Sequence, residues 1–137
     1  MLLDTNVISE LLRPQPEPRV QAFLNTPALP FVLCTVVLAE LWAGLARLPD
    51  GQRKQGLRQR SEQVLSEWTT LEAPLAFDLM AARRYADLLA HRELLGHPIS
   101  HEDAQIAAIA YAHQCTLVTR NVRDFEGCNI VLLNPWL

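Results

Sequence analysis

The chain opens with MLLDTNVISELL (residues 1–12), in which an apolar segment meets Asp4, two polar residues follow, and a second apolar segment begins. The first segment predicts a short buried strand over residues 1–4. Thr5 and Asn6 predict the turn that leads into a helix over residues 7–12. In parallel α/β sheets, ligands bind at the carboxyl ends of the strands. Asp4 is therefore the first candidate site residue.

The same alternation of strand and helix continues along the chain. Apolar runs predict further strands at residues 31–34, 116–119 and 130–133, with a very short one at 71–73. Helical spacing predicts helices at 17–24, 36–48, 52–68, 78–95 and 101–113. Thr35 and Ser100 are expected to cap two of them, and Pro27 and Pro30 to bound a loop. This order predicts one α/β domain over residues 1–137, with helices on both faces of a mostly parallel sheet of four to five short strands.

Acidic residues stand at the ends of several of these segments. Asp4 ends the first strand, Glu40 lies just after the second, Asp103 opens a helix, and Asp124 follows a later strand. Carboxylates gathered in one place repel each other unless a cation holds them. Hard cations such as Mg²⁺ or Mn²⁺ prefer oxygen ligands of this kind. The pattern predicts a metal site.

Taken singly, three of the acids have structural explanations. Asp4 or Thr5 can cap the first helix, Ser100 with Asp103 three residues later has the pattern of a capping box, and Asp124 is expected in a polar loop. Their joint placement is what favours a functional role.

Glu40 lies in a helix that is otherwise largely apolar. It shares a stripe with Gly44 and Arg47, at i, i+4 and i+7. That stripe is either a narrow solvent-exposed face or the wall of a polar cleft.

Composition limits the classes of function. The net charge of −3 argues against a strongly basic nucleic-acid-binding coat, although it does not exclude nucleic acid as a partner. Of the 12 basic residues only Lys54 is lysine, and arginine suits bidentate contact with phosphate. A codon bias would produce the same preference.

Cysteine usage and the chain start indicate the compartment. Cys34, Cys115 and Cys128 have neither paired nor metal-type spacing, which predicts free thiols in a reducing cytoplasm. The first residues lack the pattern of a signal peptide, and no apolar run approaches the roughly 20 residues of a membrane span.

The ordered set of motifs resembles the PIN-domain family, in particular the FitB-like VapC-type toxin ribonucleases of bacterial type II toxin–antitoxin systems. The resemblance covers essentially the whole chain. It is carried by LDTNVISEL (3–11), TVVLAEL (35–41), PISHEDAQIAA (98–108), LVTRN (117–121) with Asp124-Phe125, and LNPW (133–136).

The resemblance implies a three-layer α/β/α sandwich and an Mg²⁺- or Mn²⁺-dependent nuclease. Asp4, Glu40, Asp103 and Asp124 match the family's acidic quartet, with Asp4, Asp103 and Asp124 as the preferred direct ligands. Asn6 and Thr119 match the polar residues that support this quartet in the family, and Thr35 is an additional candidate for such a role.

Other positions near these motifs carry weaker expectations. Glu102 adjoins Asp103 but is expected to point elsewhere, because it lies one residue earlier on the helix. Cys34 departs from relatives that often have Ser or Ala there. Arg120 and Arg123 are either substrate-phosphate contacts or ordinary solvated loop charges.

The family also implies partners. These are a cognate VapB-like antitoxin whose tail enters the active-site groove, an RNA substrate such as tRNA, and a homodimer or a larger toxin–antitoxin assembly. The apolar residues that could form such contacts are Trp42, Leu45, Leu48, Leu57 and Trp68. Core packing is the alternative, and it is the expectation for Trp42.

Alternatives from other classes fit less well. A haloacid-type phosphatase needs a second acid where this chain has Asn6, and a receiver domain needs a strand-end lysine. The four histidines form no ligand or catalytic pattern, which disfavours a metal-free ribonuclease that uses the 2′-hydroxyl. A PIN-fold binding or regulatory module that works with its antitoxin, with weak or no catalysis, is the remaining alternative.

Overall fold

The computed structural model describes residues 1–26 and 29–137. Pro27, one boundary of the predicted loop, lies outside the described residues. The helices are α1 (Thr5–Leu11), α2 (Pro18–Leu24), α3 (Thr35–Ala46), α4 (Gln52–Leu71), α5 (Leu79–Leu94), α6 (His101–Ala112) and α7 (Val122–Phe125). The strands are β1 (Leu2–Leu3), β2 (Leu117–Val118) and β3 (Leu132–Leu133).

The sheet is parallel, and its strands run in the order β1-β2-β3. Leu3 pairs with Val118, and Val118 in turn pairs with Leu133. The prediction of four to five strands was too high for the described residues, in which the regular strands are these three. A single bridge from Leu2 to Val32 lies in the segment where a strand was expected at residues 31–34. The strand expected at 71–73 was wrong, because α4 extends to Leu71, and the backbone pairs only further along, through a bridge from Cys34 to Leu75.

These bridges extend the sheet on the β1 side. The Leu3 amide donates to the Val32 carbonyl at 3.1 Å, and the Leu75 amide donates to the Leu33 carbonyl at 2.9 Å. Across the sheet the order is therefore Leu75, residues 32–34, β1, β2 and β3. The chain reverses its direction of winding between β1 and β2, and such a switch point is where parallel sheets form ligand crevices. Asp4 and Thr119 directly follow these two strands.

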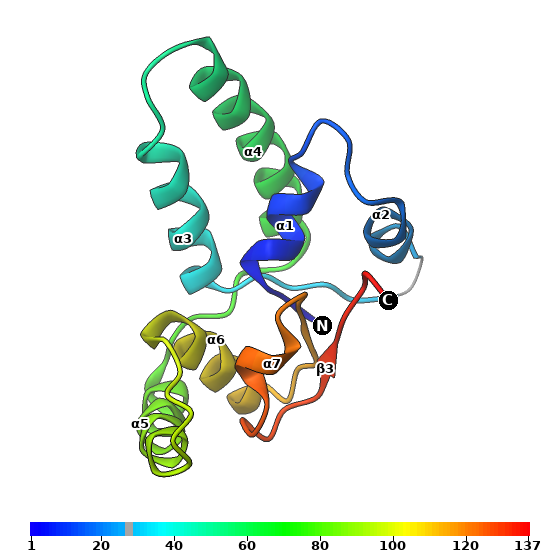
Figure 1. Ribbon diagram of the computed structural model, residues 1–137. Helices are drawn as coiled ribbons and strands as arrows, with labels where there is room; N and C mark the ends of the chain where they lie inside the picture. Colours follow the sequence, from blue (N-terminus) through cyan, green and yellow to red (C-terminus); the bar gives the residue numbers. More distant parts are fainter. Residues whose placement is uncertain (27–28) are drawn as a thin grey trace.

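The helices cover both faces of the sheet, which confirms the α/β/α arrangement. Figure 1 shows α1, α3 and α4 above the sheet and α5 and α6 below it. The helices fall on opposite faces because the connections between parallel strands are right-handed and run in opposite directions on the two sides of the switch point. Helix α6 lies in the interior, with Ile106, Ala107, Ala108 and Ile109 fully buried, and α5 packs along it.

Helix boundaries follow the capping chemistry in most places. The Ser100 hydroxyl accepts a hydrogen bond from the Asp103 amide at 3.2 Å, as predicted. The prediction that Thr35 caps α3 was wrong, because Thr35 is the first helical residue. Cys34 occupies the cap position, and its side chain makes no capping hydrogen bond. Asp124 was expected in a polar loop but lies in α7. A four-residue helix is too short to show a periodic pattern.

Some apolar side chains lie at the surface rather than in the core. The expectation that Trp42 packs in the core was wrong, because 46% of it is exposed. Trp68, in contrast, is partly buried against the core cluster. Cys34 and Cys128 are buried, and the three cysteines are free thiols. Within the described residues, no helix combines the length and the apolar character needed to cross a bilayer.

Candidate active site

Asp4 is a buried carboxylate that is held from three sides, with 5% of the residue exposed. Its Oδ1 accepts a hydrogen bond from the Thr5 amide at 2.8 Å, so Asp4 caps α1. Its Oδ2 accepts bonds from the Thr119 hydroxyl at 2.7 Å and from Asn6 Nδ2 at 3.0 Å. The capping role and a site role are therefore compatible, because the same bonds that start the helix fix the orientation of the carboxylate.

Asn6 and Thr119 connect this carboxylate to the loop after β2. Asn6 Oδ1 accepts a bond from the Arg120 amide at 3.1 Å, and its Nδ2 also lies 3.2 Å from the Thr119 hydroxyl oxygen. The Asn121 amide donates to that same hydroxyl at 3.0 Å. The structure thus brings together two of the predicted supporting residues and Asp4 at the switch point of the sheet.

Glu40 faces the start of α1 from α3. The Thr5 hydroxyl donates a hydrogen bond to Glu40 Oε2, a contact that the sequence reasoning missed. The predicted supporting residue Thr35 is exposed, and it lines a hollow of about 590 Å³ together with Glu40. The available signal for Thr5 was its place between Asp4 and Asn6, but nothing local links it to a residue 35 positions away.

Asp103 joins the group from the first turn of α6. Burial is the main cause that raises its pKa to about 6, and the charges of Asp4, Asp124 and Glu40 raise it further against the effect of the Ser100 hydroxyl. Because these charges act over short distances, the four predicted acids share one neighbourhood. Asp124 contributes from the exposed side of α7.

The pKa values of Asp4 and Glu40 are raised as well. Burial raises the pKa of Asp4, opposed by its bonds from Thr119, Thr5 and Asn6, and the Asp124 charge adds to the rise. Burial also raises the pKa of Glu40, against the bond from Thr5, and the charges of Asp4 and Glu102 contribute. Acids whose charged forms are disfavoured together are characteristic of functional sites.

Glu102 lies closer to the acidic group than the sequence suggested. It lines the same hollow as Glu40, and its charge raises the pKa of Glu40. Its side chain is exposed, whereas that of Asp103 is half-buried. The exposed side chain of Glu102 agrees with the expectation that it points away from the site, but its charge still acts on Glu40.

The donor chemistry of the site suits a hard divalent cation. The four acids, with the oxygens of Asn6 and Thr119, supply oxygen ligands only. Over residues 1–26 and 29–137, no three Asp, Glu, His or Cys side chains stand close enough together to form a ready ligand group. The exposed or half-buried carboxylates of Asp124, Asp103 and Glu40 would have to turn inward toward the fixed Asp4.

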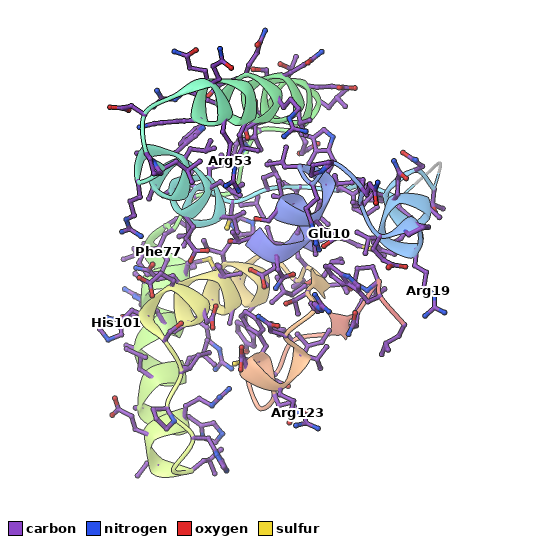
Figure 2. The ribbon with its side chains drawn as sticks, turned by 45° about the horizontal axis from the view of Figure 1, so that its top comes forward. Glu10, Arg19, Arg53, Phe77, His101 and Arg123 are labelled. Carbon is purple, nitrogen blue, oxygen red and sulfur yellow. The ribbon has the colours of Figure 1, made fainter. Side chains whose placement is uncertain are left out.

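The two arginines predicted to contact substrate lie beside this site, in different settings. Arg120 is exposed, and its guanidinium carbon stands 5.3 Å from the centroid of the Trp136 ring, a cation–π arrangement. Arg123 is exposed on α7 and points away from the molecule (Figure 2). Of the two, Arg120 is the more constrained, because its amide also donates to Asn6.

A groove of about 610 Å³ begins at Thr5 and Glu40 and runs between α1, α3 and α4. Its lining includes Leu45, Leu48 and Leu57, three of the residues predicted to form partner contacts. Three arginines also line it: Arg13 follows α1, whereas Arg53 and Arg60 lie on α4. Of these, Arg53 is labelled in Figure 2. An apolar surface that adjoins Glu40 and carries basic side chains suits a partner of mixed character.

We predict that the metal-free protein becomes more stable as the pH falls from about 6 to about 4. A carboxyl whose pKa is higher in the folded state than in the unfolded state binds its proton more tightly when folded. For Asp103, this stabilisation is fully present at a pH below the pKa of the unfolded state, 3.8, and it is lost as the pH rises through the folded-state pKa of about 6. Urea denaturation in EDTA across this range measures it.

The Asp103→Asn variant is the control for this prediction. It cannot titrate at position 103, so its stability should change less over the same pH window. A parent protein whose stability increases steadily with pH between 4 and 6 would contradict the charge coupling described above.

Comparisons with known proteins agree with this architecture. The model of the PIN domain family matches residues 1–127. The plasmid stability protein StbB of Pseudomonas syringae pv. tomato is 39% identical over 137 residues, which is 99% of this chain and 98% of that protein. The VapC ribonuclease Y4jK of Sinorhizobium fredii is 38% identical over 138 residues, with 99% and 97% covered.

A toxin and its solved complex are similar as well. The toxin FitB of Neisseria gonorrhoeae is 39% identical over 137 residues, which cover 99% of this chain and 98% of that one. The structure of FitAB bound to an IR36 DNA fragment superposes with a TM-score of 0.88 at 38% identity, covering 99% of this chain and 95% of that chain. The match to the family model, together with these relatives along the full chain, shows that the protein belongs to the PIN-domain family.

Proposed function

We propose that this protein is a divalent-metal-dependent endoribonuclease that acts as the toxin of a toxin–antitoxin pair, with residues 1–137 forming a single PIN domain. The observation that carries the proposal is the cluster of Asp4, Glu40, Asp103 and Asp124 at the switch point of a PIN sheet, where three of the four have raised pKa values. The similarity to a VapC ribonuclease supports the ribonuclease activity, and the similarity to toxin FitB supports the role as a toxin. Because the substrate is cellular RNA, the proposed location is the cytoplasm.

Each residue of the cluster has a distinct proposed role. Asp4, Asp103 and Asp124 hold Mg²⁺ or Mn²⁺, which when bound lowers the pKa of water and stabilises charge on the phosphate oxygens. Glu40, oriented by Thr5, accepts a proton from the attacking water. Asn6 and Thr119 fix the Asp4 carboxylate through the bonds described above. In-line attack by water leaves a 5′-phosphate and a 3′-hydroxyl.

The proposed partner is a VapB-like antitoxin that occupies the groove between α1, α3 and α4. The groove reaches Thr5 and Glu40, so a chain segment seated there would contact the acidic cluster at Glu40. The FitB relative has been solved in a complex, FitAB, on DNA. Exposed Trp42 lies outside this groove's lining, and we propose that it contributes to a homodimer or to a larger toxin–antitoxin assembly.

A second candidate function is a DNA-bound regulatory module with weak or no catalysis. It is favoured by the DNA fragment present in the FitAB complex. The acidic cluster favours the nuclease over the regulatory module. A module that only binds DNA does not need acids whose pKa values are raised by burial and by one another.

Sequencing of RNA ends after brief expression tests the proposal. We predict that the parent protein produces new 5′-phosphate ends at a small set of sites, with tRNA as the proposed substrate, and that it arrests growth. Co-expression of the antitoxin should suppress both effects. The Asp103→Asn variant is the matched control, and an equal yield of ends from parent and variant would reject the nuclease in favour of the regulatory module.

A further inference from the structure

Arg92, near the end of α5, is a charged side chain in the interior, with 6% of the residue exposed. Its Nε donates to the His97 carbonyl at 2.6 Å. Its Nη1 donates to the carbonyls of Asp124 at 2.9 Å and Glu126 at 2.8 Å, and lies 3.8 Å from the Cys128 sulfur. One side chain therefore connects the turn after α5 to the segment formed by α7.

Only carbonyl oxygens and a sulfur accept these bonds. The ion pairs within the described part of the chain are Arg13–Glu10, Lys54–Asp50 and His113–Asp78, so Arg92 has no carboxylate partner there. The carbonyls that it contacts on α7 belong to the unpaired, electronegative end of that helix. Replacing buried ionic groups by apolar side chains of similar volume is often neutral or stabilising. Stability alone is therefore a poor explanation for a guanidinium at this position.

Helix α7 depends on tertiary contacts for its position. It has four residues, far fewer than an isolated helix needs to be stable. Phe125, 1% exposed, anchors one side of it in the core, and Arg92 holds the carbonyls at its end. The Asp124 side chain itself is exposed. The place from which this carboxylate extends therefore depends on the backbone that Arg92 contacts.

We propose that Arg92 is a positioning residue of the nuclease site: through the Asp124 and Glu126 carbonyls it fixes α7 at the place from which the Asp124 carboxylate can turn toward Asp4 and Asp103. The proposal rests on the nuclease function proposed above, because it assigns Arg92 a role through Asp124. Arg92 itself is buried and does not contact RNA.

The chemistry of the side chain is specific to arginine. A guanidinium presents several donors in a rigid plane, which lets Nε and Nη1 contact two different segments at once. A lysine at this position has a single nitrogen that donates hydrogen bonds, so it cannot contact both the His97 carbonyl and the carbonyls at the end of α7. Arg92→Lys should therefore keep the charge but lose the connection.

A double-mutant cycle tests the proposal. We predict that Arg92→Met lowers kcat for RNA cleavage by about 10- to 100-fold with little change in KM, since a displacement of about 1 Å costs on this order. In an Asp124→Asn background, the same Arg92→Met change should lower the remaining activity by less than about 2-fold. Equal losses in the two backgrounds would overturn the proposal.

Arg84→Met is the matched control. Arg84 lies on the same helix and donates to the Cys128 carbonyl at 3.2 Å, and its guanidinium stacks on the Tyr111 ring at 3.9 Å. It contacts neither the Asp124 nor the Glu126 carbonyl, so whatever effect it has should be equal in the parent and in the Asp124→Asn background. Coupling of the same size in this control would mean that any disturbance of α5 acts on Asp124.

Hydrogen exchange supplies a readout that does not depend on activity. The amides of Asp124 and Cys128 are bonded to the Asn121 and Phe125 carbonyls within the α7 segment. We expect these amides to exchange at least about 10-fold faster in Arg92→Met while those of α6 remain unchanged. Arg92→Lys serves if the methionine variant does not fold. Unchanged exchange would reject the positioning role, whereas a parent that cleaves no RNA would reject only the nuclease proposal.

Discussion

Asp103→Asn is expected to reduce RNA cleavage by about 10²- to 10³-fold, the usual effect of removing one preorganised electrostatic group from an active site. The substitution keeps the shape of the side chain and removes its charge. Asp103 is the clearest single test, because the capping bond to Ser100 comes from its backbone amide, which the substitution leaves in place. Initial rates on a defined RNA, with excess Mg²⁺, measure the change.

The same variant should be at least as stable as the parent when metal is absent. The pKa of Asp103 is raised to about 6, so at pH 7 its charged form is disfavoured by the folded state, and a neutral amide removes that penalty. Thermal unfolding in EDTA checks this. A variant that is inactive and also strongly destabilised would mean that Asp103 is structural, and one as active as the parent would remove it from the site.

Removal of divalent metal is expected to lower cleavage by about 10³-fold or more, because a catalytic metal contributes several kcal/mol and each ~1.4 kcal/mol is a factor of ten. Dialysis against EDTA followed by addition of Mg²⁺ or Mn²⁺ should restore the activity. Bound metal should also raise the unfolding temperature, since it relieves the repulsion among Asp4, Asp103 and Asp124.

The control for this experiment is the Asp103→Asn variant, whose unfolding temperature should respond less to added metal. Cleavage that persists in EDTA and leaves cyclic phosphate ends would identify a 2′-hydroxyl mechanism instead. That outcome would contradict the assignment of the acids as metal ligands, although it would leave the fold unaffected.

The parts of the structure that the sequence predicted are those with a local signal. The apolar runs before Asp4 and around Leu117 and Leu132 indicated the strands, and Ser100 marked the start of α6 correctly. The strand expected at residues 31–34 is reduced to bridges, and the one expected at 71–73 is absent, with a bridge at Leu75 instead. Pairing over one residue leaves no pattern in the sequence that distinguishes it from a loop.

The parts that the sequence could not predict depend on distant contacts. The Thr5 bond to Glu40 spans 35 residues. Arg92 lies on a helix with many polar residues, so its type alone suggested a solvent-exposed side chain rather than a buried one. The gathering of the acids was predicted from their placement at segment ends and from the family resemblance, whereas the polar bonds that hold Asp4 became visible only in the structure.

The hydrogen bond between Asp4 and Thr119 has a consequence for synthesis. It joins residues 115 positions apart, and β1 finds its partner β2 only at that distance along the chain. A ribosome making this protein must release the chain as far as Thr119 before these residues can meet, since the exit tunnel delivers the N-terminal end first. The nascent chain therefore emerges without an assembled cluster, and the RNA of its own translation machinery is not exposed to the proposed activity until residue 119 has left the tunnel.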